Sequence, residues 1–230
     1  FIGFIEKGAV ICTYECPKCH SIYTTHWFSH RSGLSNTCEG EIGGPSRIST
    51  AMTVSNTFAS NILTDNSGNR MAVVGFSSGD NENGGAADEA ITASSDLTDS
   101  VSTIQTAVST MTANGGTNYT AALAKAQSIL DGRTEKSRRA YVIFISDGAP
   151  GPYGKSANDN KWNGSEQAAT LKNAGVKLYT IGIALDDNSS SYLRSLASDS
   201  THYINVTDEN YATELSNIMT EWATQIGKTP

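Results

Sequence analysis

The sequence predicts an α/β protein of three layers, in which helices cover both faces of a doubly wound, mainly parallel sheet. Residues 71–76 form a continuous apolar run, as expected of a strand that is buried on both faces, and two further runs, at 141–146 and 177–183, are largely apolar. Segments in which apolar residues recur at helical spacing separate these runs. Strands that alternate with helices favour a parallel sheet over an antiparallel sandwich.

The first half of the chain supplies two helices and two strands. A helix is expected at 47–63, where apolar residues recur near helical spacing, and the polar turn cluster at 64–69 ends it. The strand at 71–76 leads through a polar, glycine-rich loop to a short edge strand at 90–93. Apolar residues at steps of three and four then predict an amphipathic helix at 99–112.

The second half continues the same alternation. A helix is expected at 119–131, where an Asp-Gly pair stops it before the strand at 141–146. The chain closes with a helix at 209–226. No apolar run reaches 18 residues, so the sequence predicts no membrane span.

Composition limits the function. The formal net charge is −7 and no basic stripe occurs, which argues against a nucleic-acid partner. Lys and Arg together number only 16 among 230 residues, whereas Ser, Thr, Asn and Gly are abundant. This balance favours an extracellular protein at a cell surface.

Two polar residues stand where a parallel sheet binds ligands. Thr117 lies in the glycine-rich turn at 114–120, and Asp147 directly follows the strand at 141–146. Both are expected at the carboxyl edge of the sheet, where open α/β folds place their sites. A hydroxyl and a carboxylate are hard oxygen donors that suit Mg²⁺ or Ca²⁺. We expect their side-chain oxygens within ~8 Å of each other, the reach of one cation or water.

The Thr117 turn and the Asp147 strand end resemble the second and third segments of the metal-ion-dependent adhesion site in von Willebrand factor A (VWA) domains. Segments 171–184, 191–198 and 202–206 are similar to the helix-to-strand step, the next helix and the closing strand of that family. The resemblance extends over residues 45–228. It implies a Rossmann-like fold in which Thr117 and Asp147 hold a divalent cation, and an acidic side chain of a protein partner completes the coordination.

The family's first segment, Asp-x-Ser-x-Ser at the end of the first strand, has no counterpart before the helix at 47–63. In the family's strand order, 3-2-1-4-5-6, that strand is central. In one interpretation, which we favour, it precedes Phe1 and residues 1–44 are an insertion. In the other, residues 8–14 are the central strand and the metal site is degenerate.

Residues 1–44 form a Cys/His-rich insertion or N-terminal module that contains every cysteine of the chain. One interpretation is a structural Zn²⁺ site built on a Cys-x-x-Cys knuckle and two histidines. The other is a pair of disulfides in a secreted segment; free thiols are the remaining alternative. The candidate residues are Cys12, Cys16, Cys19, Cys38, His26 and His30.

These observations favour a binding module: a metal-ion-dependent adhesion domain of a microbial surface or pilus protein, which binds a protein ligand or neighbouring pilus subunits. The alternative is a structural subunit of a filament or envelope whose metal site is vestigial. No nucleophile with a histidine partner, phosphate loop or acid–base carboxylate pair is evident, so we do not expect an enzyme.

The four cysteines should be crosslinked, because segment 12–38 has too few aliphatic residues to order itself by burial. Intact-mass measurement before and after reduction and chelation separates the two crosslinks. A gain of two hydrogens per bond on reduction identifies disulfides, and loss of one bound metal on chelation identifies zinc. Four thiols that alkylate freely in the untreated native protein would contradict both.

Overall fold

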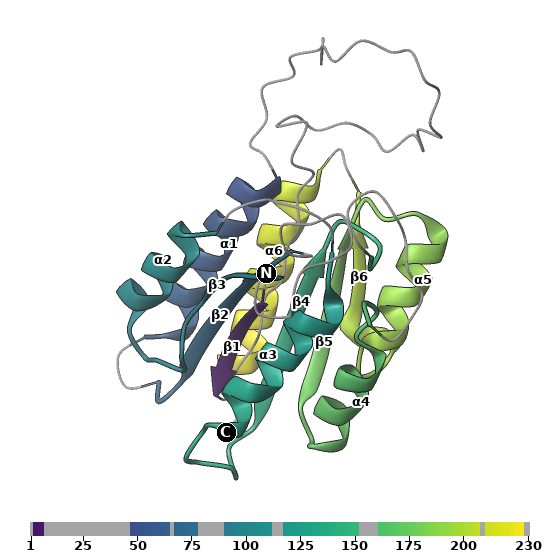
Figure 1. Ribbon diagram of the computed structural model, residues 1–230. Helices are drawn as coiled ribbons and strands as arrows, with labels where there is room; N and C mark the ends of the chain where they lie inside the picture. Colours follow the sequence, from purple (N-terminus) through teal and green to yellow (C-terminus); the bar gives the residue numbers. More distant parts are fainter. Residues whose placement is uncertain are drawn as a thin grey trace.

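A six-stranded sheet organises the computed structural model, which describes residues 2–6, 47–64, 67–77, 90–111, 117–151, 161–207 and 210–227. The strand order is β3-β2-β1-β4-β5-β6 (Figure 1). The strands are β1 (Ile2–Glu6), β2 (Arg70–Phe76), β3 (Ile91–Ser94), β4 (Ala140–Ser146), β5 (Lys177–Ile183) and β6 (Tyr203–Val206).

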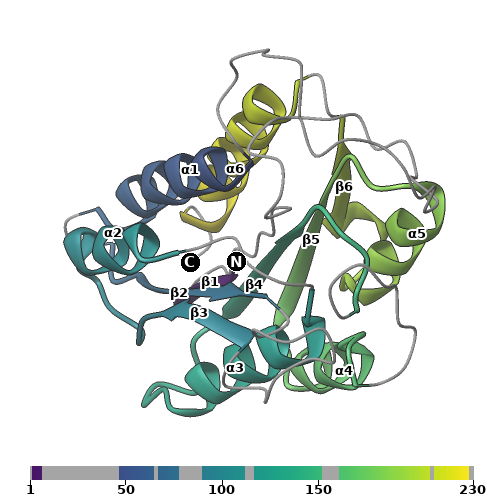
Figure 2. The ribbon, with the colours of Figure 1, turned by 45° about the horizontal axis from the view of Figure 1, so that its top comes forward.

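Helices cover both faces of this sheet, as Figure 2 shows. On one face α1 packs against α2 and α6, and on the other α4 packs against α3 and α5. The predicted three-layer α/β fold is therefore confirmed. The helices are α1 (Arg47–Ile62), α2 (Val101–Ser109), α3 (Tyr119–Asp131), α4 (Ser165–Asn173), α5 (Asp187–Leu196) and α6 (Tyr211–Gly227).

Four of the six strands run in one direction, in line with the predicted parallel arrangement, although three of the five neighbouring pairs are antiparallel. Strands β4, β5 and β6 pair in parallel, and β2 runs in the same direction as they do. Edge strand β3 is antiparallel to β2, and central strand β1 is antiparallel to both of its neighbours. Ile2 lies opposite Val74 of β2 and Phe144 of β4, so β1 begins near the carboxyl ends of those strands.

The origin of the central strand differs from both interpretations of the sequence. We expected it before Phe1 or at residues 8–14, but Ile2–Glu6 occupies the central position. The segment is short, and its hydrogen-bonding partners in β2 and β4 are remote in sequence, so no local pattern indicates the pairing. Residues 8–14 and the Cys/His-rich segment lie outside the described residues. The crosslink and the domain boundary after residue 44 stay predictions.

Helices α1, α2, α3 and α6 and strands β2, β4 and β5 form close to where the apolar pattern predicts them, because each buries the face that carries it. All seven residues of β4 are buried, which explains its largely apolar run. The second helix begins at Val101 rather than 99, because Ser100 caps it and accepts a hydrogen bond from the Thr103 backbone N–H at 3.2 Å. Within the described part of the chain, no helix combines the length and apolar character needed to cross a membrane.

The turn before β6 is organised around one carboxylate. Asp199 Oδ1 accepts hydrogen bonds from the Thr201 hydroxyl at 2.6 Å and the Thr201 backbone N–H at 2.9 Å. His202 Nδ1 lies 2.7 Å from the same oxygen. The Thr201 hydroxyl, followed by His202, lowers the pKa of Asp199 from 3.8 to about 2.

Asp199→Asn should lower the stability of the protein near neutral pH and have little effect at pH 2. Because the folded pKa lies below the unfolded one, the wild-type contribution is present above about pH 4 and is lost as the pH falls toward 2. Urea unfolding of both proteins at several pH values measures this. A stability difference that stays constant with pH would contradict the assignment.

Candidate functional site

The candidate site is the carboxyl edge of the sheet, where β2 and β4 end on either side of β1. Ser77 directly follows β2 and Asp147 directly follows β4. The turn that leads into α3 carries Thr117. Ser77 and Thr117 are each 3% exposed, and so is the Asp147 side chain. The edge is therefore lined by polar residues that are largely withdrawn from solvent.

Backbone hydrogen bonds hold the Thr117 turn to both neighbouring segments. Thr117 and Gly151 exchange two backbone hydrogen bonds of 2.8 Å, which join the turn to the chain just beyond Asp147. The Asn118 backbone N–H donates to Ser77 O at 3.1 Å, and Asn118 Oδ1 caps α3 by accepting from the Ala121 N–H at 2.9 Å. The turn is thus fixed to the ends of two strands by contacts that do not depend on the Thr117 side chain.

Side-chain hydrogen bonds converge on the carbonyl oxygen of Gly148. The Ser146 hydroxyl donates to it at 3.0 Å, and the Tyr119 hydroxyl donates to it at 2.6 Å. Beneath it, the Tyr119 ring meets the Phe144 ring edge to face at 4.7 Å and the Phe76 ring at 6.3 Å. These ring contacts hold Tyr119 in place, and Tyr119 in turn holds the segment that carries Asp147.

A cation lies beside Asp147. Arg47, the first residue of α1, donates from Nη1 to Asp147 Oδ2 at 3.0 Å. The two side chains are 13% and 3% exposed, so the ion pair is shielded from bulk water. The sequence alone does not indicate Arg47, because the pair joins residues 100 positions apart and no local motif marks it.

The predicted residues Thr117 and Asp147 thus lie in segments that the backbone brings to one edge. Their role as cation ligands, and the expected distance between their oxygens, stay predictions. A hard divalent cation prefers about six oxygen ligands. Among the described residues, no group of three or more His, Cys, Asp or Glu is arranged to hold a metal. In this arrangement the guanidinium already neutralises Asp147, so a divalent cation fits only if Arg47 moves away.

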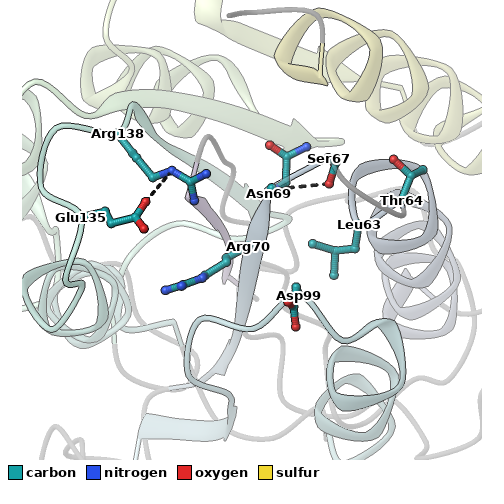
Figure 3. Close-up of a pocket in the computed structure, with 9 residues that line it drawn as sticks. Leu63, Thr64, Ser67, Asn69, Arg70, Asp99, Glu135 and Arg138 are labelled. Atoms are coloured by element: carbon teal, nitrogen blue, oxygen red, sulfur yellow. Dashed lines mark hydrogen bonds and ion pairs between the residues drawn. The ribbon is translucent and has the colours of Figure 1, made fainter.

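A second polar region lies at the opposite edge of the sheet, where β2 begins. Arg70, Asp99, Glu135 and Arg138 line a cavity of about 500 Å³ there (Figure 3). Arg138 Nε pairs with Glu135 Oε2 at 2.8 Å, so opposite charges are matched within the lining. Neither Thr117 nor Asp147 contributes to this cavity.

Comparison with known families gives one clear match. The family model described as von Willebrand factor type A domain matches residues 41–220, which is most of the chain. A comparison with curated protein sequences finds no match.

Solved structures with the same fold include two pilus proteins. The pilus adhesin SpaC from Lactobacillus rhamnosus GG, in its open conformation, has a TM-score of 0.62 at 17% identity, and the match covers 79% of this chain and 28% of SpaC. The von Willebrand factor domain of the type V pili tip protein Mfa5 from Porphyromonas gingivalis has a TM-score of 0.58 at 15% identity, over 80% of this chain and 90% of that domain.

A third similar structure is proximal thread matrix protein 1 from the mussel byssus, with a zinc-occupied MIDAS motif. Its TM-score is 0.51 at 19% identity, and the match covers 76% of this chain and 41% of that protein. At these identities the likeness shows the fold alone. The chain spans less than a third of the length of SpaC.

Tyr119→Phe should lower the free energy of unfolding by about 0.5–1.5 kcal/mol, the usual contribution of one hydrogen bond. The ring and its aromatic contacts remain in this variant, and only the hydroxyl that donates to Gly148 is lost. Urea unfolding checks this. An unchanged midpoint would contradict the role of the hydroxyl in holding the segment that carries Asp147.

Proposed function

The chain belongs to the von Willebrand factor type A domain family, and on that premise we propose that it is a protein-binding module of a microbial surface or pilus adhesin. The observation that carries the proposal is the carboxyl edge, where backbone hydrogen bonds join the segments that carry three polar residues largely withdrawn from solvent: Ser77, Thr117 and Asp147. The pilus proteins SpaC and Mfa5 share the fold, which supports the same class of function.

The partner is a protein that offers an acidic side chain at this edge. Thr117 and Asp147 would hold Mg²⁺ or Ca²⁺, and the bound cation would supply the positive charge that attracts the partner's carboxylate. Buried hydroxyl and carboxylate oxygens are the donors that these cations prefer. The low content of Lys and Arg, with abundant Ser, Thr and Asn, suits an extracellular, cell-surface location. We assign no catalytic step to the site.

A structural subunit of a filament or envelope is the second candidate. The Arg47–Asp147 ion pair favours it, since a carboxylate that is already neutralised needs no metal to remain buried. A structural subunit would self-associate through its surface and would bind neighbours equally well with and without a divalent cation. Sedimentation velocity over a range of concentrations, in EDTA and in Mg²⁺, separates the two candidates.

Selection of a displayed peptide library on the full chain in Mg²⁺ should enrich peptides that contain Asp or Glu. Their binding should fall at least ~10-fold in EDTA, and by a similar factor in Asp147→Ala and Thr117→Ala, because a buried charged contact is worth a decade or more in affinity. Surface plasmon resonance measures each affinity.

Asp96→Asn is the matched control, because it removes an aspartate that lines a separate cavity beside Arg70 at the opposite edge. It should leave peptide affinity unchanged. Selected peptides that bind wild type, Asp147→Ala and Thr117→Ala equally would overturn the proposed site.

A further inference from the structure

We propose that Arg47 is an internal cation that competes with a divalent metal ion for Asp147, so that the metal binds only when the guanidinium is displaced. This inference rests on the proposed function, since it concerns the same carboxylate. Arg47 Nη1 lies 3.0 Å from Asp147 Oδ2, within hydrogen-bonding distance. A charge-assisted hydrogen bond to a buried carboxylate is stronger than one between neutral groups.

The position of Arg47 at the start of α1 is a second reason to expect that a metal ion can displace it. Arg47 begins α1, and the first turn of that helix has no acidic residue. The amino end of a helix carries partial positive charge, which disfavours a cation there and favours an anion. Arg47 therefore stands where the helix dipole disfavours a cation, and its ion pair with Asp147 offsets that cost.

The two members of the pair are anchored differently, Asp147 at the end of a sheet strand and Arg47 at the start of a helix. Asp147 follows a fully buried strand. The carbonyl oxygen of the next residue, Gly148, accepts hydrogen bonds from the Ser146 and Tyr119 hydroxyls. Arg47 is the more exposed member of the pair and has a long, flexible side chain. Displacement of the guanidinium toward solvent therefore requires no movement of β4.

Two cations at Asp147 exclude each other. A metal ion bound to this carboxylate would lie a few ångströms from the guanidinium, where like charges repel strongly in a shielded site. Removal of the charge at position 47 should therefore strengthen metal binding. A residue that only anchored the helix would not have this effect, because its loss would weaken the site.

Mn²⁺ titration followed by electron paramagnetic resonance tests the inference on the full chain. Arg47→Gln should bind Mn²⁺ at least ~10-fold more tightly than wild type, because it removes a unit of like charge beside the ion. Arg47→Lys keeps the charge and should stay within ~3-fold of wild type. Asp147→Asn and the double variant Arg47→Gln/Asp147→Asn should both bind weakly. Arg70→Gln, at the opposite edge, is the matched control and should change nothing.

Wild-type protein supplies a second measurement that does not depend on the folding of a variant. Side-chain NMR of ¹⁵N-labelled arginines should show the Arg47 guanidinium signals shifting and exchanging faster with water as Mg²⁺ is added. Saturation with Mg²⁺ that leaves these signals unchanged would overturn the inference.

The Mn²⁺ affinities distinguish a failure of this inference from a failure of the proposed cation site. Equal Mn²⁺ affinity in wild type and Arg47→Gln, with weaker binding in Asp147→Asn, overturns the inference and leaves the proposed cation site standing. Mn²⁺ affinity that is independent of both residues overturns the inference and the cation site together. The peptide selection still decides whether the carboxyl edge binds a protein partner.

Discussion

The central strand determines how the rest of the molecule is arranged. β1 pairs with β2 on one side and β4 on the other, so it satisfies backbone groups of both halves of the sheet that would otherwise be buried without partners. Because β1 runs against both neighbours, its last residue lies beside Arg70 and Ala140, at the edge opposite Asp147. The first residue of α1 meets Asp147.

The candidate site is held mainly by its backbone. Thr117 is joined to Gly151 by a pair of hydrogen bonds and its neighbour Asn118 is joined to Ser77, so three separate segments are fixed without any ligand. Such a scaffold keeps donor groups in place before a partner arrives, which reduces the entropy lost on binding. Electrostatic balance in the same region comes from α1 and β4, through one ion pair. The backbone geometry of the candidate site and its charge balance thus come from different parts of the chain.

Elements whose interactions are local in sequence could be predicted, whereas those with remote partners could not. The strands β2, β4 and β5 were predicted because burial on both faces leaves largely apolar runs in the sequence itself. Thr117 and Asp147 were found because each lies next to a recognisable element. β1 was not predicted, because five residues carry no periodic signal and their partners in β2 and β4 are remote. Arg47 was missed for the same reason, since its partner lies 100 residues away.

The pairing of β1 also has a consequence for how the protein is made. Ile2 emerges from the ribosome before Val74 and long before Phe144, although it lies between them in the finished sheet. These partners follow roughly 70 and 140 residues later, a delay of roughly 4 to 30 s at about 5 to 20 residues per second. Closing such long loops is slow compared with forming the helices and the parallel pairs between neighbouring strands. β1 is therefore incorporated only after β2 and β4 have been made, and until then the sheet lacks its central strand.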